Sequence, residues 1–121
     1  MSNSVQDFFD KMKELLPSTS QEYDESIKLN GEILETVIIE DVFMPEILKL
    51  LSEDKEIKIL QAIFAYIEKV VNEDKHLRDI LSITMMEILG NDKIILETAR
   101  KYLGSTSMKL QLEADKGLGR I

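Results

Sequence analysis

Residues 55–71 read KEIKILQAIFAYIEKVV, and this stretch decides the fold that the sequence predicts. Its large apolar side chains recur at the spacing of one face of an α-helix. They are Ile57, Leu60, Ile63, Phe64, Ile67, Val70 and Val71. Ile59, Ala62 and Tyr66 widen the apolar surface around the helix axis. Such a helix needs neighbours on more than one side, so we expect residues 57–71 to be central in the domain.

Short polar turns divide this half of the chain into helices. They lie at 52–55, 72–75 and 90–93, and each ends in Asp-Lys. Because a carboxylate can accept hydrogen bonds from the free N–H groups of a first helical turn, the sequence predicts three N-caps. They are Asp54, Asp74 and Asp92, which open helices over 57–71, 77–89 and 93–103. Gly104 is expected to close the third of these helices, and residues 106–116 are expected to form a last one.

The N-terminal part of the chain is also helical in pattern. We expect a first helix over residues 4–16, with Ser4 as its N-cap and with Pro17 ending it. A second helix over residues 21–30 is expected to end at the turn signal Asn30-Gly31.

Residues 32–43 include the run Val37-Ile38-Ile39, which would suit a β-strand. The apolar residues of the segment nevertheless keep helical spacing, and the sequence has no second strand candidate to satisfy the backbone of a lone strand. We therefore predict a helix. Pro45 lies in its continuation and leaves two alternatives: a long helix kinked near 43–44, or a break with Pro45 in the first turn of a short helix over 45–52.

Together these segments predict a single all-α domain over residues 1–121. It would contain six or seven helices, antiparallel because their connections are short. A helix about every 20 residues gives a helix pair about every 40, which is the period of HEAT-like repeats. The segments share this layout but not their side-chain detail, so a HEAT-like helical stack and an irregular bundle both remain open.

Composition narrows the classes of function. The chain has no cysteine, which excludes disulfides, thiolate metal sites and cysteine nucleophiles. The N-terminus lacks the features of a signal peptide, and no apolar run approaches the roughly 20 residues that span a bilayer. We therefore expect a soluble, cytoplasmic protein with no membrane partner. A net charge of −8, with no basic cluster larger than Arg100-Lys101, argues against a nucleic-acid partner.

The negative charge is concentrated in one third of the chain. Residues 22–56 contain eleven acids and three bases, whereas the remainder contains twelve of each. Solubility alone would disperse the acids along the chain, so this asymmetry favours a docking face for a basic protein partner. The candidate partner-binding residues are Glu32, Glu35, Glu40, Asp41 and Glu46. The alternative is that these acids only keep a small protein soluble.

No arrangement of residues points to catalysis. His76 is the only histidine, and its Glu-x-x-His spacing with Glu73 spans a predicted turn and lacks the second such motif of a di-iron site. Glu40-Asp41 could do acid–base chemistry if buried, but on an amphipathic helix the pair fits an outward face. The sequence has neither a glycine-rich phosphate loop nor a credible Ser/His/Asp set. We therefore expect a protein that is not an enzyme and that holds no metal or cofactor.

From about residue 35 onward the sequence resembles a poorly characterised family of small all-helical bacterial proteins. Four segments carry the similarity: EDVF at 40–43, AIFAYIEKV at 62–70, SITMMEILGND at 82–92 and RKYLGSTSMKLQLEAD at 100–115. Ser105 stands where that family often has proline, a departure that touches only a turn. Members of the family look like the immunity proteins encoded beside secreted polymorphic toxins.

The resemblance implies a binding module that neutralises a cognate toxin by occluding it, without a reaction of its own. Many such toxin domains are basic nucleases, so the acidic segment 22–56 agrees with that implication. Two hypotheses follow. The first is an immunity-type inhibitor that binds a basic toxin domain through its acidic face. The second is a structural or regulatory adaptor that holds a peptide or a partner helix in the groove of a helical stack.

Overall fold

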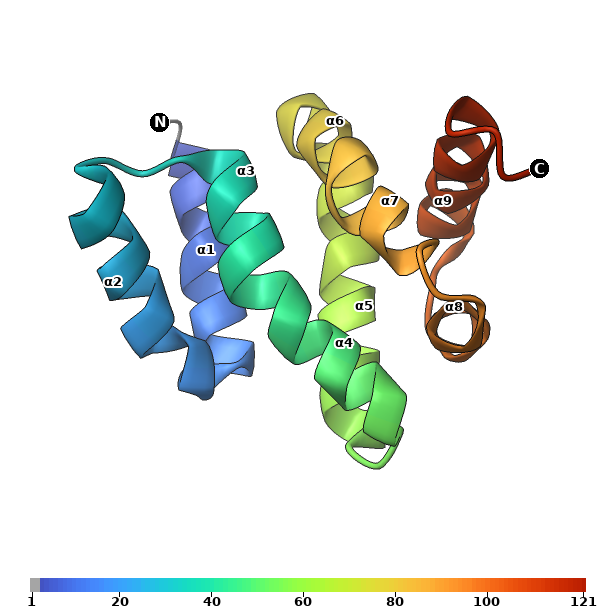
Figure 1. The fold of residues 1–121 in the computed structure, drawn as a ribbon, viewed down its shortest axis with the longest axis horizontal. Coiled ribbons are helices and arrows are strands. Elements are labelled where there is room, and N and C mark those ends of the chain that lie inside the picture. The colour runs from blue at the N-terminus through green and yellow to red at the C-terminus, as the bar shows by residue number, and fades with distance from the viewer. Residues whose placement is uncertain (1–2) are drawn as a thin grey trace.

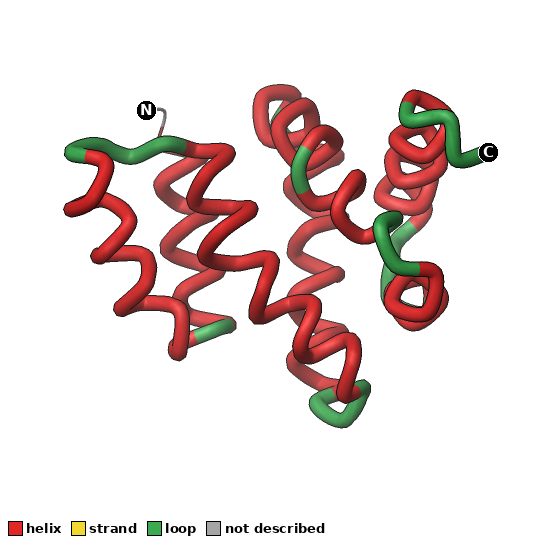
Figure 2. The backbone as a smooth tube through the Cα atoms, viewed as in Figure 1, coloured by secondary structure: helices red, strands yellow, loops and turns green. Residues whose placement is uncertain are grey.

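The structure is a computed structural model that describes residues 3–121. Helices joined by short loops make up this part of the chain, with no β-strand in it, so the predicted all-α fold is confirmed (Figure 2). The elements are α1 Asn3–Leu15, η1 Pro17–Thr19, α2 Ser20–Asn30, α3 Glu35–Ile38, η2 Ile39–Phe43, α4 Met44–Glu53, α5 Ile57–Glu73, α6 Lys75–Ile83, α7 Met85–Leu89, α8 Lys93–Arg100 and α9 Ser105–Gly117.

The helices form an irregular bundle, which is one of the two arrangements that the sequence left open (Figure 1). α2 lies at one end of the long axis, and α8 and α9 lie at the other. If the runs 35–53 and 75–89 are each taken as one helix, residues 3–121 contain seven helices, within the predicted six or seven. None of the helices in these residues is long and apolar enough to cross a bilayer.

The helix α5 is the element on which the others assemble. It contacts α1, α4, α6 and α9, so the predicted central position of residues 57–71 is confirmed. Its buried side chains are Leu60, Ile63, Phe64, Ile67, Val70 and Val71. Ile57 is the one member of the predicted stripe that stays outside the core, because it is the first residue of the helix and 50% exposed.

Aromatic rings join the N-terminal helices to one another. The ring centroid of Phe9 in α1 lies 5.8 Å from that of Tyr23 in α2 and 5.9 Å from that of Phe43 in η2. Phe8 stacks on Tyr66 of α5 with a centroid separation of 5.9 Å. Such ring pairs add to the free energy of burial. Tyr23 is the single buried residue of α2, so this cluster holds α2 on the bundle.

Two predicted helix boundaries in the N-terminal part have different outcomes. α2 matches the predicted helix over 21–30, and Gly31 ends it with a φ of 72°, the left-handed conformation that glycine adopts without strain. Ser4 is not an N-cap, because α1 begins at Asn3 and Ser4 lies inside its first turn.

Pro45 is accommodated by a helical turn of a different kind. Helical conformation continues from Glu35 to Glu53 without a break, and Pro45 lies in the first turn of α4, as the second alternative placed it. The turn η2 is π-helical, and the N–H of Met44 donates to the carbonyl of Ile39, five residues back. In a regular α-helix the ring of Pro45 would clash with the carbonyl four residues earlier. The wider π turn directly before Pro45 therefore lets the helix pass the proline.

The predicted helix over 77–89 is interrupted. α6 ends at Ile83 and α7 begins at Met85, because Thr84 has a φ of −109° and a ψ of −83°, outside the α region. The Thr84 hydroxyl donates to the carbonyl of Ile80 at 2.7 Å. A threonine that bonds the carbonyl four residues back tends to bend a helix, which gives the break a physical cause.

Two of the three predicted aspartate N-caps are confirmed. Asp74 accepts a hydrogen bond from the N–H of Leu77, and Asp92 accepts from Ile94 and Ile95. Asp54 is not an N-cap, because it ends α4 in the left-handed conformation with a φ of 47°, and the residue directly before α5 is Glu56. Its carboxylate serves a different contact, described below.

Gly104 also differs from its prediction. The last regular residue of α8 is Arg100, and Gly104 lies directly before α9 in extended conformation, with a φ of −74° and a ψ of 176°. It therefore begins the last helix and does not close the one before. The reason glycine is needed there is the close approach of Glu68.

Candidate functional site

The five predicted partner-binding acids lie on the segment 32–46, but they do not share one face. Glu32 is exposed in the loop between α2 and α3, and Glu40 and Asp41 are exposed on the π-helical turn η2. Glu46 is half-buried in the first turn of α4. Glu35, the first residue of α3, is turned toward α6 and contacts His76.

A groove between α2 and the α3–η2 run brings together acids that the sequence alone did not group. Its volume is about 330 Å³. Its lining combines carboxylates and apolar side chains: Glu22, Glu25 and Leu29 come from α2, Val37 from α3, and Asp41 and Val42 from η2. We call this feature the α2–η2 groove.

The carboxylates of the α2–η2 groove form no ion pair within residues 3–121. In the described residues no lysine or arginine forms an ion pair with Glu22, Glu25 or Asp41. Leu29 stands beside them with 87% of its surface exposed. The groove therefore combines an exposed apolar side chain with carboxylates that form no ion pair.

His76 lies in the first turn of α6, and its neighbours do not form a metal site. Its Nε2 is 2.9 Å from Oε1 of Glu35 across the interface between α6 and α3. Glu73, which the sequence placed at ligand spacing from it, ends α5 and so lies on a different helix. Across residues 3–121 no three histidine, aspartate or glutamate side chains come together as metal ligands would.

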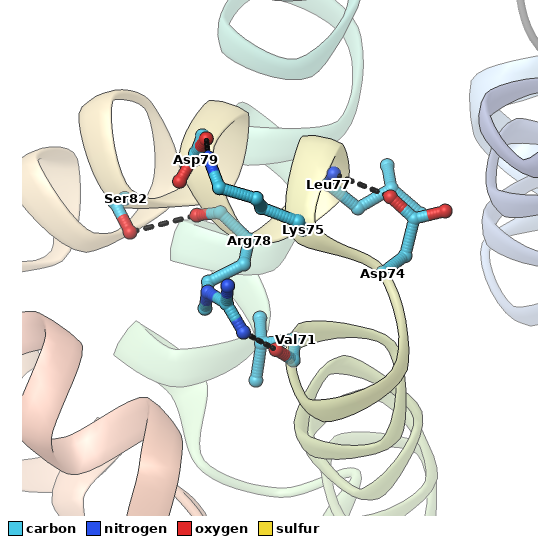
Figure 3. A network of polar contacts seen from close by, with 7 residues as sticks. All are labelled: Val71, Asp74, Lys75, Leu77, Arg78, Asp79 and Ser82. Carbon is cyan, nitrogen blue, oxygen red and sulfur yellow. Dashed lines mark hydrogen bonds and ion pairs between the residues drawn. The ribbon is translucent and has the colours of Figure 1, made fainter.

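The junction of α5 and α6 is held by polar contacts with backbone groups (Figure 3). Asp74 accepts from the N–H of Leu77 at 2.9 Å, and the Arg78 side chain reaches the carbonyl of Val71 at the end of α5 at 3.4 Å. The hydrogen bond from Leu77, followed by one from the Ser4 hydroxyl, lowers the pKa of Asp74. These contacts fix the angle between two helices and so serve structure.

The carboxylate of Glu68 is a functional cap that sequence reasoning missed. It lies on α5 and accepts from the N–H of Thr106 at 3.0 Å and from the N–H and hydroxyl of Ser107, each at 2.8 Å. A side chain of one helix thus satisfies the free N–H groups of another, α9. An added Cβ at Gly104 would lie 2.5 Å from Cγ of Glu68, so only glycine leaves room for this approach.

The same hydrogen bonds decide the protonation of Glu68. Burial alone would raise the pKa of the carboxyl, but the bonds from Ser107 and Thr106 outweigh it and lower the pKa to about 2. A glutamate in the interior of an apolar helix carries no local signal of this role. The sequence gives one indication of the contact, Gly104 followed by a Ser/Thr run, but that pattern predicted the end of a helix.

Asp54 links α4 to the segment after α8. It accepts from Nζ of Lys101 at 2.6 Å and from the hydroxyl of Tyr102 at 2.7 Å. The hydrogen bond from Lys101, and then that from Tyr102, lowers the pKa of Asp54.

Within residues 3–121 the fold defines a small all-α domain, and an acidic groove lies between its α2 and η2 elements. The chain belongs to the family described as Domain of unknown function (DUF7674), which matches residues 9–118. Neither a curated protein nor a solved structure matches the chain.

Proposed function

We propose that this protein is a non-catalytic binding module that docks a basic protein partner in the α2–η2 groove. The groove itself carries the proposal, because Leu29, which is exposed, and Val37, which is partly exposed, offer apolar surface beside carboxylates that form no ion pair with the chain. A partner segment with alternating apolar and basic residues would bury the former and place the latter beside Glu25 and Asp41.

The more specific form of the proposal is an immunity-type inhibitor that occludes a cognate toxin in the cytoplasm. The resemblance of residues 62–70 and 82–92 to proteins that look like immunity proteins supports it. The charge supports it as well, since a basic toxin domain would be complementary to a chain of net charge −8. In this form the partner is a protein, and neither nucleic acid nor membrane is bound.

The second form is a structural or regulatory adaptor that holds a peptide or partner helix. The specific observation in its favour is Leu29, which is 87% exposed at the groove. A partner helix laid along α2 would cover it, in the helix-in-groove mode of recognition. The inhibitor form and the adaptor form of the proposal involve the same groove residues. They differ in whether the partner loses an activity when it is bound.

The test uses the full chain and the product of the neighbouring gene, with association rates measured at low and high salt. Glu25→Lys combined with Asp41→Lys is expected to slow association roughly tenfold or more and to remove much of its salt dependence. The matched control is Glu53→Lys with Glu113→Lys, which makes the same change of net charge at exposed positions outside the groove.

The control distinguishes the groove from bulk charge. If both double variants slow association equally, the acids act only through net charge and the groove is not the docking site. If the neighbouring protein is a toxin whose activity survives saturating amounts of this chain, the immunity form is wrong and the adaptor form stays.

A further inference from the structure

A partly buried polar cluster lies at the opposite end of the molecule from the α2–η2 groove, where the loop before α8 meets α9 and the residues after it (Figure 1). Arg120 donates from Nη1 to the backbone carbonyl of Glu87 and to Oδ1 of Asp115, both at 3.0 Å. Its Nη2 donates to Oδ1 of Asn91. One guanidinium group is therefore bound by three acceptors from three different elements.

Asp115 makes this cluster more than a surface ion pair. Asp115 is 4% exposed, so its carboxylate is a buried anion that needs a cation or several donors. The cation comes from residues 118–121, which follow α9. Leu118 and Ile121 in that segment are 48% and 68% exposed, so the segment is not packed into the core.

Gly90 provides the space in which these groups meet. A Cβ at Gly90 would collide with Oδ1 of Asp115 and with Nη1 of Arg120, and would lie 2.9 Å from Nε2 of Gln111. Any other residue would displace the polar groups, whereas glycine leaves a cradle for a planar cation beside the carboxylate.

The side chain of Gln111 has hydrogen-bonding groups in this cluster that Arg120 does not use. The Gln111 side chain is fully buried, and neither Nε2 nor Oε1 has a hydrogen-bond partner in the described part of the chain. Buried amides are almost always paired, so an unpaired one beside a bound guanidinium indicates acceptor capacity that Arg120 leaves unused.

A cavity of about 490 Å³ opens beside the cluster, which is the size of a small-molecule or side-chain site. Asp115 and Arg120 line it, and α8 contributes Lys93, Glu97 and Arg100. Among the described residues neither Lys93 nor Arg100 forms an ion pair. The cavity therefore combines acceptors suited to a guanidinium with a contribution from α8 in which two cations outnumber the one carboxylate of Glu97, and which suits a ligand carboxylate.

We propose that the cluster around Gly90 is an arginine-binding site, which Arg120 fills in the isolated chain and a ligand arginine fills by displacing it. The ligand class is a peptide arginine with a carboxylate close to it: the guanidinium pairs with Asp115, and the carboxylate lies near Lys93 and Arg100. This inference goes beyond the proposed function and shares no residue with the α2–η2 groove.

The test uses the full chain with Arg120→Ala, and N-acetylarginine as the probe. Binding is followed by the backbone amide resonances of Gly90 and Asn91. We expect saturable shifts in the variant, with an affinity at least tenfold tighter than in the wild type. A site that Arg120 occupies about nine-tenths of the time lowers the apparent affinity of a competitor about tenfold.

Two comparisons make the experiment decisive. Asp115→Asn combined with Arg120→Ala removes the carboxylate and is expected to abolish binding, while N-acetylargininamide, which lacks the carboxylate, is expected to bind more weakly than N-acetylarginine. Arg120→Gln replaces Arg120→Ala if the alanine variant does not fold. An absence of shifts in a folded Arg120 variant, or equal affinity with and without Asp115, overturns the proposal.

Discussion

In helices α1 to α4 a cluster of aromatic rings joins the elements and several acidic side chains are exposed without an ion pair, whereas in α5 to α9 acidic side chains also bind the N-termini of helices. Phe9, Tyr23 and Phe43 join three elements of the first region through ring contacts. In the second region Glu68 and Asp92 each bind the free N–H groups of a helix.

This difference separates two kinds of carboxylate: those that hold helices in place and those that remain open to a partner. A carboxylate that accepts backbone hydrogen bonds is committed to the fold, and its charge is already balanced by the helix terminus. Glu25 and Asp41 have no such commitment: within residues 3–121 neither forms an ion pair, and neither lies at the N-terminus of its helical run. The chain therefore contains acids that stabilise the fold and other acids whose charge is available to a partner.

The largest expected effect lies in the aromatic region. Phe43→Ala removes a ring that is 1% exposed and contacts both Phe9 and Tyr23, so we expect a loss of about 3–5 kcal/mol in the free energy of unfolding. Urea unfolding followed by circular dichroism measures it. A loss below about 1 kcal/mol would mean that the ring cluster does not hold the N-terminal helices.

A middle-sized effect is expected at the cap of α9. Gly104→Ala forces Glu68 away from the helix terminus and should cost about 1–3 kcal/mol, and Glu68→Gln should cost about 1–2 kcal/mol. Both changes break the same contact, so the double variant should lose clearly less than the sum. Strict additivity in the double-mutant cycle would show that Gly104 and Glu68 act separately.

The cap of α9 also predicts a pH dependence. The pKa of Glu68 is lowered from 4.5 to about 2 in the folded chain, so its contribution to stability is complete above pH 4.5 and is lost as the pH falls toward 2. The stability difference between wild type and Glu68→Gln should therefore shrink across that window. A difference that stays constant from neutral pH to pH 2 would contradict the assignment.

A smaller effect is expected at the start of α8. Asp92→Ala removes a carboxylate that accepts from Ile94 and Ile95, and should cost about 0.5–2 kcal/mol. Glu97→Ala is the control, an exposed acid on the same helix whose removal should change stability by less than about 0.5 kcal/mol. Equal thermal midpoints for the two variants would remove the distinction between capping and free acids.

The smallest effect on stability is expected in the α2–η2 groove. Leu29→Ser alters a side chain that is 87% exposed, so the free energy of unfolding should change by less than about 0.5 kcal/mol. The affinity for the partner should nevertheless fall, because the apolar contact is lost. If calorimetry shows unchanged affinity, Leu29 lies outside the interface.

The sequence was sufficient for features that depend on periodicity or on one local contact. The helical spacing of residues 57–71 predicted a central helix, and Asp74 and Asp92 lie in the position of an N-cap with respect to their own helices. These inferences require only neighbours along the chain, so they were confirmed.

Features that depend on a distant partner could not be predicted in this way. Asp54 has the same local sequence as the true caps, yet its contacts are Lys101 and Tyr102, nearly fifty residues away in the chain. The five acids proposed as one face were grouped by sequence position. The placement of Glu35 beside His76, and of Asp41 beside α2, follows from how the helices pack.

The π-helical turn 39–43 has a consequence for chain length. A π turn contains one residue more than an α turn, so removing one residue there would leave α3 and α4 in the same rotational phase and the core side chains in place. Pro45 is the obstacle, since a regular helix would bring its ring against a carbonyl. Relatives shorter by one residue in this segment should therefore lack the proline.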